Sequence, residues 1–250
     1  MRSGIITSVS LMLLFLMAAL FVFLSVKTYR NNYFNYNLLR LDPLDEDRSG
    51  EQLANLNTSE IWMLGDSRIA RWDKDLLTEE SEIANLGIEG QTSAQVYYRL
   101  KNYLIADTPS LLILQVGIND LKVIGLDKNL ETEIVSNLYR NIKAICSLCI
   151  ENNIRVILLN IFPIGKIEPA RRLVWNKNVE KALLTINEDL KSLSDNRHIF
   201  YFDAYSILSD GGMRVRREFQ DDFLHINTSG YNLLSARMKE QIRNVFNSKE

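Results

Sequence analysis

The stretch Ile61-Trp62-Met63-Leu64-Gly65-Asp66-Ser67 decides the fold of this chain of 250 residues. A short apolar run of strand length ends in a glycine, and a small polar turn follows it. Further apolar runs, each bounded by a turn signal, lie at residues 83–86, 111–116, 154–161 and 199–202. These runs predict five buried strands.

Helical patterns separate the predicted strands. Apolar residues recur on one helical face within residues 97–104, 179–193 and 234–245. Strands that alternate with helices indicate a parallel sheet covered on both faces, which is an α/β fold. In such folds the loops after the carboxyl ends of the strands build the site. We therefore expect the functional residues to follow the strands.

The amino-terminal segment differs from the rest of the chain. Residues 5–26 are uncharged and almost continuously apolar, long enough to cross a bilayer as a helix. Lys27-Thr28-Tyr29-Arg30 follows without a small-x-small cleavage site, which favours an uncleaved anchor over a cleaved signal peptide. We expect an anchor over residues 1–28, a polar linker over 29–58 and a folded domain over 59–250.

Composition excludes several classes of partner and site. The 29 basic and 31 acidic residues give a net charge of -2, which does not favour a nucleic-acid partner. Cys146 and Cys149 lie on or beside the apolar stripe of a predicted helix, so we interpret them as small core residues. A metal site would need more ligands than this pair supplies, and we predict none.

A serine, a histidine and a carboxylate supply the parts of acyl-transfer chemistry. Ser67 follows the first strand, where it is either a nucleophile or a helix N-cap. His225 is the candidate base, because the other histidine, His198, has no motif beside it. Asp222, three residues before His225, can orient the imidazole, and the neighbouring Asp221 is the weaker candidate for that role.

Two further residues are candidate donors to an oxyanion. Gly90 suits a position where the backbone approaches a substrate, and the Asn119 amide follows the third strand. Taken alone, Gly117-Ile118-Asn119-Asp120 is also typical of an ordinary strand-ending turn.

The four segments together resemble the SGNH (GDSL) hydrolases. The resemblance covers roughly residues 59–246 and rests on Gly65-Asp66-Ser67, the segment 85–92 with Gly90, Gly117-Ile118-Asn119-Asp120, and Asp222-Phe223-Leu224-His225. It implies a three-layer α/β/α fold with a five-stranded, mainly parallel, flavodoxin-like sheet. It also implies a serine nucleophile, Ser67, Gly90 and Asn119 as oxyanion donors, and ester hydrolysis without a metal or cofactor.

The expected function is hydrolysis of short acyl esters, especially O-acetyl groups, through an acyl-enzyme. A lysophospholipase or thioesterase, an O-acyltransferase acting on envelope polysaccharide, and a non-catalytic binding module are the alternatives. Arg68 departs from the leucine of the family's namesake tetrapeptide, and it either meets an acidic or sugar substrate or caps a helix. Partners are then a small ester, glycan or lipid substrate and the membrane. The resemblance implies a catalytic domain on the extracytoplasmic side, whereas the positive charges that flank residues 5–26 favour the cytoplasmic side.

Overall fold

A computed structural model describes residues 2–44, 56, 59–78 and 81–248 of the chain. Its centre is a five-stranded sheet in the order β2-β1-β3-β4-β5, with every neighbouring pair parallel. The strands are Ile61–Gly65 (β1), Ile83–Gly87 (β2), Leu111–Gln115 (β3), Arg155–Leu159 (β4) and Ile199–Phe202 (β5). This confirms the predicted α/β class and the parallel sheet.

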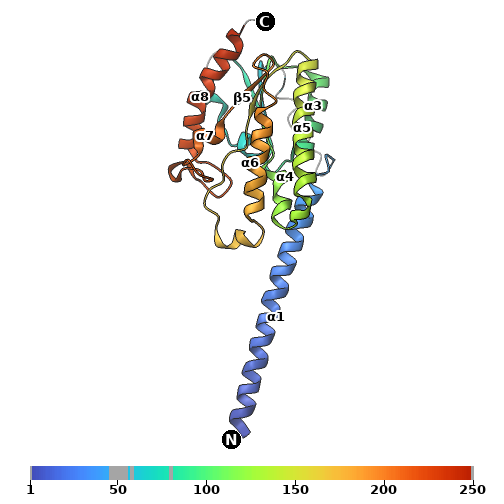
Figure 1. Ribbon diagram of the computed structural model, residues 1–250, viewed down its shortest axis with the longest axis vertical. Coiled ribbons are helices and arrows are strands. Elements are labelled where there is room, and N and C mark those ends of the chain that lie inside the picture. The colour runs from blue at the N-terminus through green and yellow to red at the C-terminus, as the bar shows by residue number, and fades with distance from the viewer. Residues whose placement is uncertain (1, 45–55, 57–58, 79–80, 249–250) are drawn as a thin grey trace.

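Helices cover both faces of this sheet (Figure 1). They are α2 (Ser67–Ala70), α3 (Ser93–Ala106), α4 (Ile118–Leu121), α5 (Glu131–Glu151), α6 (Lys177–Lys191), α7 (Ala204–Leu208) and α8 (Thr228–Asn247). Short 3-10 helices are η2 (Lys74–Leu76), η3 (Lys122–Gly125), η4 (Lys128–Leu130), η5 (Pro169–Leu173) and η6 (Arg217–Phe219).

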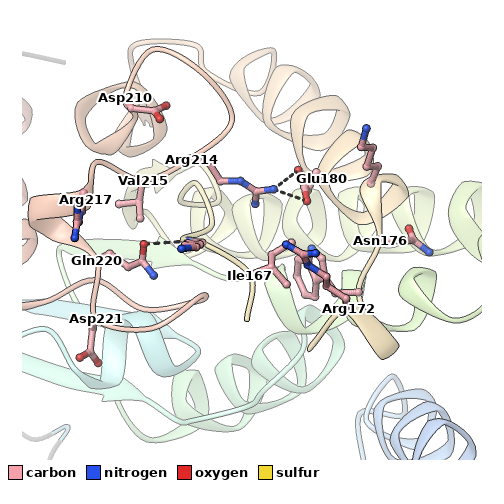
Figure 2. A pocket seen from close by; sticks show the side chains of 13 residues that line it. Ile167, Arg172, Asn176, Glu180, Asp210, Arg214, Val215, Arg217, Gln220 and Asp221 are labelled. Atoms are coloured by element: carbon pink, nitrogen blue, oxygen red, sulfur yellow. Dashed lines mark hydrogen bonds and ion pairs between the residues drawn. The ribbon is translucent and has the colours of Figure 1, made fainter. Parts of the chain in front are cut away.

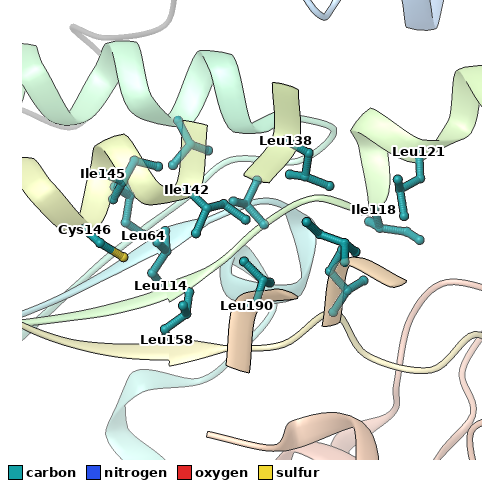
Figure 3. Packing of buried hydrophobic residues seen from close by; sticks show 14 of the residues in the cluster. Leu64, Leu114, Ile118, Leu121, Leu138, Ile142, Ile145, Cys146, Leu158 and Leu190 are labelled. Carbon is teal, nitrogen blue, oxygen red and sulfur yellow. The ribbon is translucent and has the colours of Figure 1, made fainter. Parts of the chain in front are cut away.

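Successive side chains of each strand point to opposite faces of the sheet, as the two-residue period of a strand requires. They therefore pack into two separate hydrophobic layers. Leu64 packs with Leu138 of α5 and with residues of α3 and α6, whereas Met63 packs with Leu234 of α8. Figure 3 shows the first layer, where Ile142 of α5 lies above the sheet. Both layers are free of solvent at their centres, so the sheet is a rigid platform for the loops at its carboxyl edge.

The two cysteines belong to this core. Cys146 and Cys149 of α5 are buried and unbridged, as the helical stripe predicts. Burial raises the pKa of the Cys146 thiol to about 12, so it stays protonated and unreactive in the folded protein.

The amino terminus forms one long helix, α1 (Arg2–Leu39), which projects from the domain (Figure 1). Residues Ser8–Leu39 are long and apolar enough to cross a membrane, and the most hydropathic window is not buried against the protein. A helix with apolar side chains around its whole circumference is typical of a lipid-embedded segment or a signal sequence.

The end of this helix lies against the folded domain. We expect a linker over residues 29–58, but residues 29–39 continue the helix. Arg30 Nη1 donates to the Leu173 carbonyl at 2.7 Å, Asn37 is 4% exposed, and Thr92 Oγ1 donates to the Arg40 carbonyl at 2.6 Å. Residues 45–55, 57 and 58 lie outside the described part, so the domain boundaries stay a prediction.

Candidate active site

Ser67 occupies the first turn after β1. Asp66 caps α2, with its Oδ1 accepting from the Arg68 N–H at 2.9 Å. Gly65 is required before it, because a Cβ there would lie 1.9 Å from the Gln115 carbonyl oxygen of β3. This close approach of β1 to β3 turns the chain sharply and sets Ser67 at the carboxyl edge of the sheet.

His225 and Asp222 meet this serine from the other end of the chain. Ser67 Oγ lies 2.9 Å from His225 Nε2, and His225 Nδ1 lies 2.7 Å from Asp222 Oδ2. The other Asp222 oxygen accepts from the backbone N–H groups of Leu224 and His225, at 2.7 and 2.9 Å. Although burial opposes it, these hydrogen bonds hold the pKa of Asp222 below its usual range, so the carboxylate is charged at neutral pH.

This arrangement can transfer a proton from a hydroxyl. A charged Asp222 fixes Nδ1 of His225 as the protonated nitrogen, which leaves Nε2 as an acceptor that faces Ser67. Ser67 is 7% exposed, and the His225 side chain is 13% exposed, so both groups meet solvent only through a small opening.

Three N–H groups in the loops after β1, β2 and β3 are candidate donors to an oxyanion: the backbone N–H groups of Ser67 and Gly90 and the side-chain amide of Asn119. No described residue accepts from the backbone N–H of Ser67 or of Gly90. Asn119 Nδ2 donates one hydrogen to the Gln91 carbonyl at 2.9 Å, and this bond holds the amide in place while its second hydrogen remains available. Gly90 has φ +77°, a conformation that glycine adopts without strain.

Two buried polar residues to which the sequence assigns no role, Asp120 and Arg99, tie these loops together. Asp120 accepts from the Ser93 N–H and, at 2.5 Å, from its hydroxyl, which joins α4 to the start of α3. Arg99 of α3, 1% exposed, donates to the Gln91 side chain at 2.7 Å and to the Leu86 carbonyl at 2.8 Å. Asp120 stands in the Gly117-Ile118-Asn119-Asp120 segment, which does not say what its carboxylate contacts. Arg99 is marked only by its place in an apolar helical stretch.

Arg68 is placed differently from a substrate-binding residue. Its side chain is fully buried, with Nε donating to the Leu224 carbonyl at 3.1 Å and the guanidinium 5.2 Å from the Phe162 ring centroid. Arg68 therefore links the turn at residues 65–67 (the serine turn) to the loop at residues 222–225 (the histidine loop). To contact a substrate, its side chain would have to leave the interior.

Asp221 and His198 are the alternatives to Asp222 and His225 in the triad of Ser67, His225 and Asp222, and both make other contacts. The Asp221 carboxylate lies 3.8 Å from Arg71, while Asp222 pairs with the imidazole. His198 pairs with Asp195 at 3.2 Å on an exposed turn. The Asp221 carboxylate does not pair with the His225 imidazole, and the His198 imidazole does not pair with Ser67.

A cavity of about 1000 Å³ lies beside the loop that carries His225, and Ser67 is not among the residues that line it (Figure 2). Gln220 and Asp221 form one side of it, and Arg172 faces them. Arg214 donates to both oxygens of Glu180 across the cavity wall, at 3.0 and 3.1 Å. Charged and amide side chains dominate the lining, which suits a polar ligand better than a fatty acyl chain.

Comparisons with known proteins agree with this arrangement. Residues 59–233 match the GDSL-like lipase/acylhydrolase family. A GDSL-like lipase from Bacteroides thetaiotaomicron shares the fold with a TM-score of 0.63 at 21% identity, covering 78% of this chain and 96% of that one. An acetyl xylan esterase does so with a TM-score of 0.56 at 19% identity, covering 73% and 98%.

A curated relative of known activity matches a smaller part of its own length. The N-acylneuraminate cytidylyltransferase of Escherichia coli is 24% identical over 191 residues, which is 75% of this chain but 41% of the relative. The match to the family model covers more than half of the chain and includes Ser67, Gly90, Asn119, Asp222 and His225. The chain therefore belongs to the GDSL-like lipase/acylhydrolase family.

Proposed function

We propose that the protein is a serine-dependent esterase that releases short acyl groups, O-acetyl groups in particular, through an acyl-enzyme. The observation that carries this proposal is the 2.9 Å contact between Ser67 Oγ and His225 Nε2, backed by the 2.7 Å contact between His225 and Asp222. This is the geometry of a nucleophile with its base and the group that orients the base.

The reaction has two steps. His225 Nε2 takes the proton of Ser67 as Oγ bonds to the ester carbonyl carbon, and the carbonyl oxygen becomes an oxyanion held by the N–H groups of Ser67, Gly90 and Asn119. The C–O bond to the alcohol then breaks, and His225 returns the proton to the departing oxygen. Water repeats these steps on the acyl-enzyme, releasing the carboxylic acid and restoring Ser67.

A short acyl group is supported by the surroundings of the serine. Ser67 is 7% exposed, and the large cavity beside the histidine loop is lined mostly by polar side chains. A long acyl chain needs an apolar channel of matching length, whereas an acetyl group needs only the space beside the oxyanion donors.

Chain-length preference tests the proposal. The full-length protein in detergent should hydrolyse para-nitrophenyl acetate with a higher kcat/KM than the octanoate and palmitate esters, and the Ser67→Ala variant should hydrolyse none of them. A preference for palmitate would instead indicate a lysophospholipase or thioesterase. Activity that survives in Ser67→Ala would remove the serine from the reaction.

We also propose that the domain lies on the extracytoplasmic side of a membrane, anchored by α1. The support is the exposed apolar surface of α1, together with the hydrolysis proposed above, which consumes only the ester and water. A reporter that is active only outside the cytoplasm, fused after Glu250, should give a signal, and a silent fusion of a protein that is stably made would reverse the orientation.

A further inference from the structure

A cluster of positive side chains surrounds the candidate oxyanion donors. Lys122 begins η3, directly after α4, and stands three residues beyond Asn119. Side chains three residues apart in helical backbone lie on the same face. We therefore expect the side chains of Lys122 and Asn119 to lie on the same face of this helical segment.

The Lys122 side chain is partly buried and holds no anion of its own. No hydrogen bond or close ion pair joins its ammonium to a residue within the described ranges. Such a group offers three N–H donors, and leaving them without acceptors in a partly dry site costs free energy. The acidic group that acts on this ammonium is Asp66, whose carboxylate already caps α2.

Two arginines from separate elements complete the cluster. Arg40, at the end of α1, sits against Gly90: its Nη1 lies 2.7 Å from the position that a Cβ on Gly90 would occupy. Arg171 of η5 lies over the ring of Phe223 in the histidine loop, 5.1 Å from the ring centroid. Both interact electrostatically with Lys122.

Charge counting gives the region a positive potential. Arg40, Arg171 and the buried Arg68 each act on Lys122 as like charges. Against them stand Asp66, Asp120 and Asp222. Burial raises the pKa of Asp120 to about 7, and Asp222 is engaged by His225. Fixed cations in a poorly solvated site attract a negatively charged ligand and repel one another until it binds.

We propose that the site takes an acyl ester whose alcohol carries an anionic group close to the ester oxygen, and that Lys122, with Arg40 and Arg171 around it, binds that group. The anion is a carboxylate or a phosphate, since either accepts several charge-assisted hydrogen bonds. This inference rests on the proposed esterase function and names its substrate class. Lys122 is a specificity-determining residue in this account.

Matched ester pairs test the proposal in two arms. The carboxylate arm compares acetylsalicylate with methyl acetylsalicylate, and the phosphate arm compares acetyl glycerophosphate with monoacetin. For the full-length protein in detergent, kcat/KM should favour the charged member of at least one pair by about ten- to hundredfold. The arm with the larger ratio identifies the anion.

Three variants locate the effect. Lys122→Met should lower the charged-to-neutral ratio to near one, and Lys122→Arg should retain most of it because the positive charge stays. Lys143→Met, which changes an exposed lysine on α5, should leave the ratio as it is in the wild type. Melting temperatures of all three show that each variant is folded.

The outcomes separate this inference from the esterase proposal. Hydrolysis of both members of both pairs with ratios near one would overturn the anionic substrate while leaving the esterase intact. Hydrolysis of no ester would overturn the esterase itself. A Lys122→Met protein that loses stability and slows both members equally would show that Lys122 only balances Asp66, which also overturns the inference.

The ratio should also depend on pH. Burial lowers the pKa of Lys122 to about 8, Asp66 opposes this, and Arg40, Arg68 and Arg171 add to it. Because the ammonium is charged below this pKa, the charged-to-neutral ratio in kcat/KM for the carboxylate pair should be constant from about pH 5 to pH 7 and fall above pH 8. Lys122→Arg should remove the fall, and a wild-type ratio that is flat through pH 9 would contradict the role of Lys122.

Discussion

The Asn119→Ala substitution, compared with a matched control, separates two roles of the Asn119 side-chain amide: donation to the oxyanion and donation to the Gln91 carbonyl. One N–H of this amide donates to the Gln91 carbonyl, and the other is available to an oxyanion. Loss of an oxyanion donor lowers kcat by about 10²–10³. Loss of the bond to Gln91, a residue 2% exposed, leaves a buried carbonyl without its donor and destabilises the protein by about 1–3 kcal/mol.

Asn187→Ala is the matched control. Asn187 is also a buried amide, bonded to the backbone of Ile161 through Nδ2 at 2.9 Å and Oδ1 at 2.8 Å, and it lies on α6. We expect a comparable loss of stability without the loss of turnover. The assay is initial-rate hydrolysis of para-nitrophenyl acetate by the full-length protein, with urea denaturation followed by circular dichroism.

The comparison of the two variants decides the role of Asn119. We expect kcat to fall only in Asn119→Ala, while both variants lose stability. An unchanged kcat in Asn119→Ala would refute the oxyanion role, and an equal fall in Asn187→Ala would show that destabilisation alone accounts for the loss.

The remaining predictions concern the triad and the core. Asp222→Asn should lower kcat by about 10⁴, because a neutral amide no longer fixes the His225 tautomer, and the same acetate assay measures this. Leu138→Ala should reduce the free energy of unfolding by about 2–5 kcal/mol in urea titrations, because Leu138 is fully buried in the α5 layer. Cys146 and Cys149 should react with Ellman's reagent only after unfolding, and reaction in the native protein would contradict their burial.

Local patterns were enough to predict the sheet. Each strand is a short apolar run that ends at a turn signal, so β1 and β3 are visible without any long-range information. The predicted run 154–161 is longer than β4, because the Asn160 side chain turns to Tyr201, Asp203 and the Tyr205 N–H instead of continuing the strand. Apolar sequence continues past this point, so the end of the strand could not be read from it.

The site was only partly predictable. Ser67 and His225 are 158 residues apart, and their meeting follows from the parallel sheet that collects the loops at one edge. Arg68 shows what neighbouring sequence conceals: it follows the serine directly, yet α2 turns its side chain into the interior. The position of Arg40 relative to Gly90 and Lys122 follows from how α1 packs against the domain, and no local sequence pattern encodes that packing.

The most direct test of the central claim is to label the full-length protein with a fluorophosphonate and map the adduct by mass spectrometry. The account predicts one modified residue, Ser67, and no labelling of Ser67→Ala. The rate at which Ser67 is labelled should fall sharply in His225→Ala, because the Ser67 hydroxyl then lacks its base. A protein that hydrolyses acetate esters while the label is absent from Ser67 or attached to another serine would contradict the account.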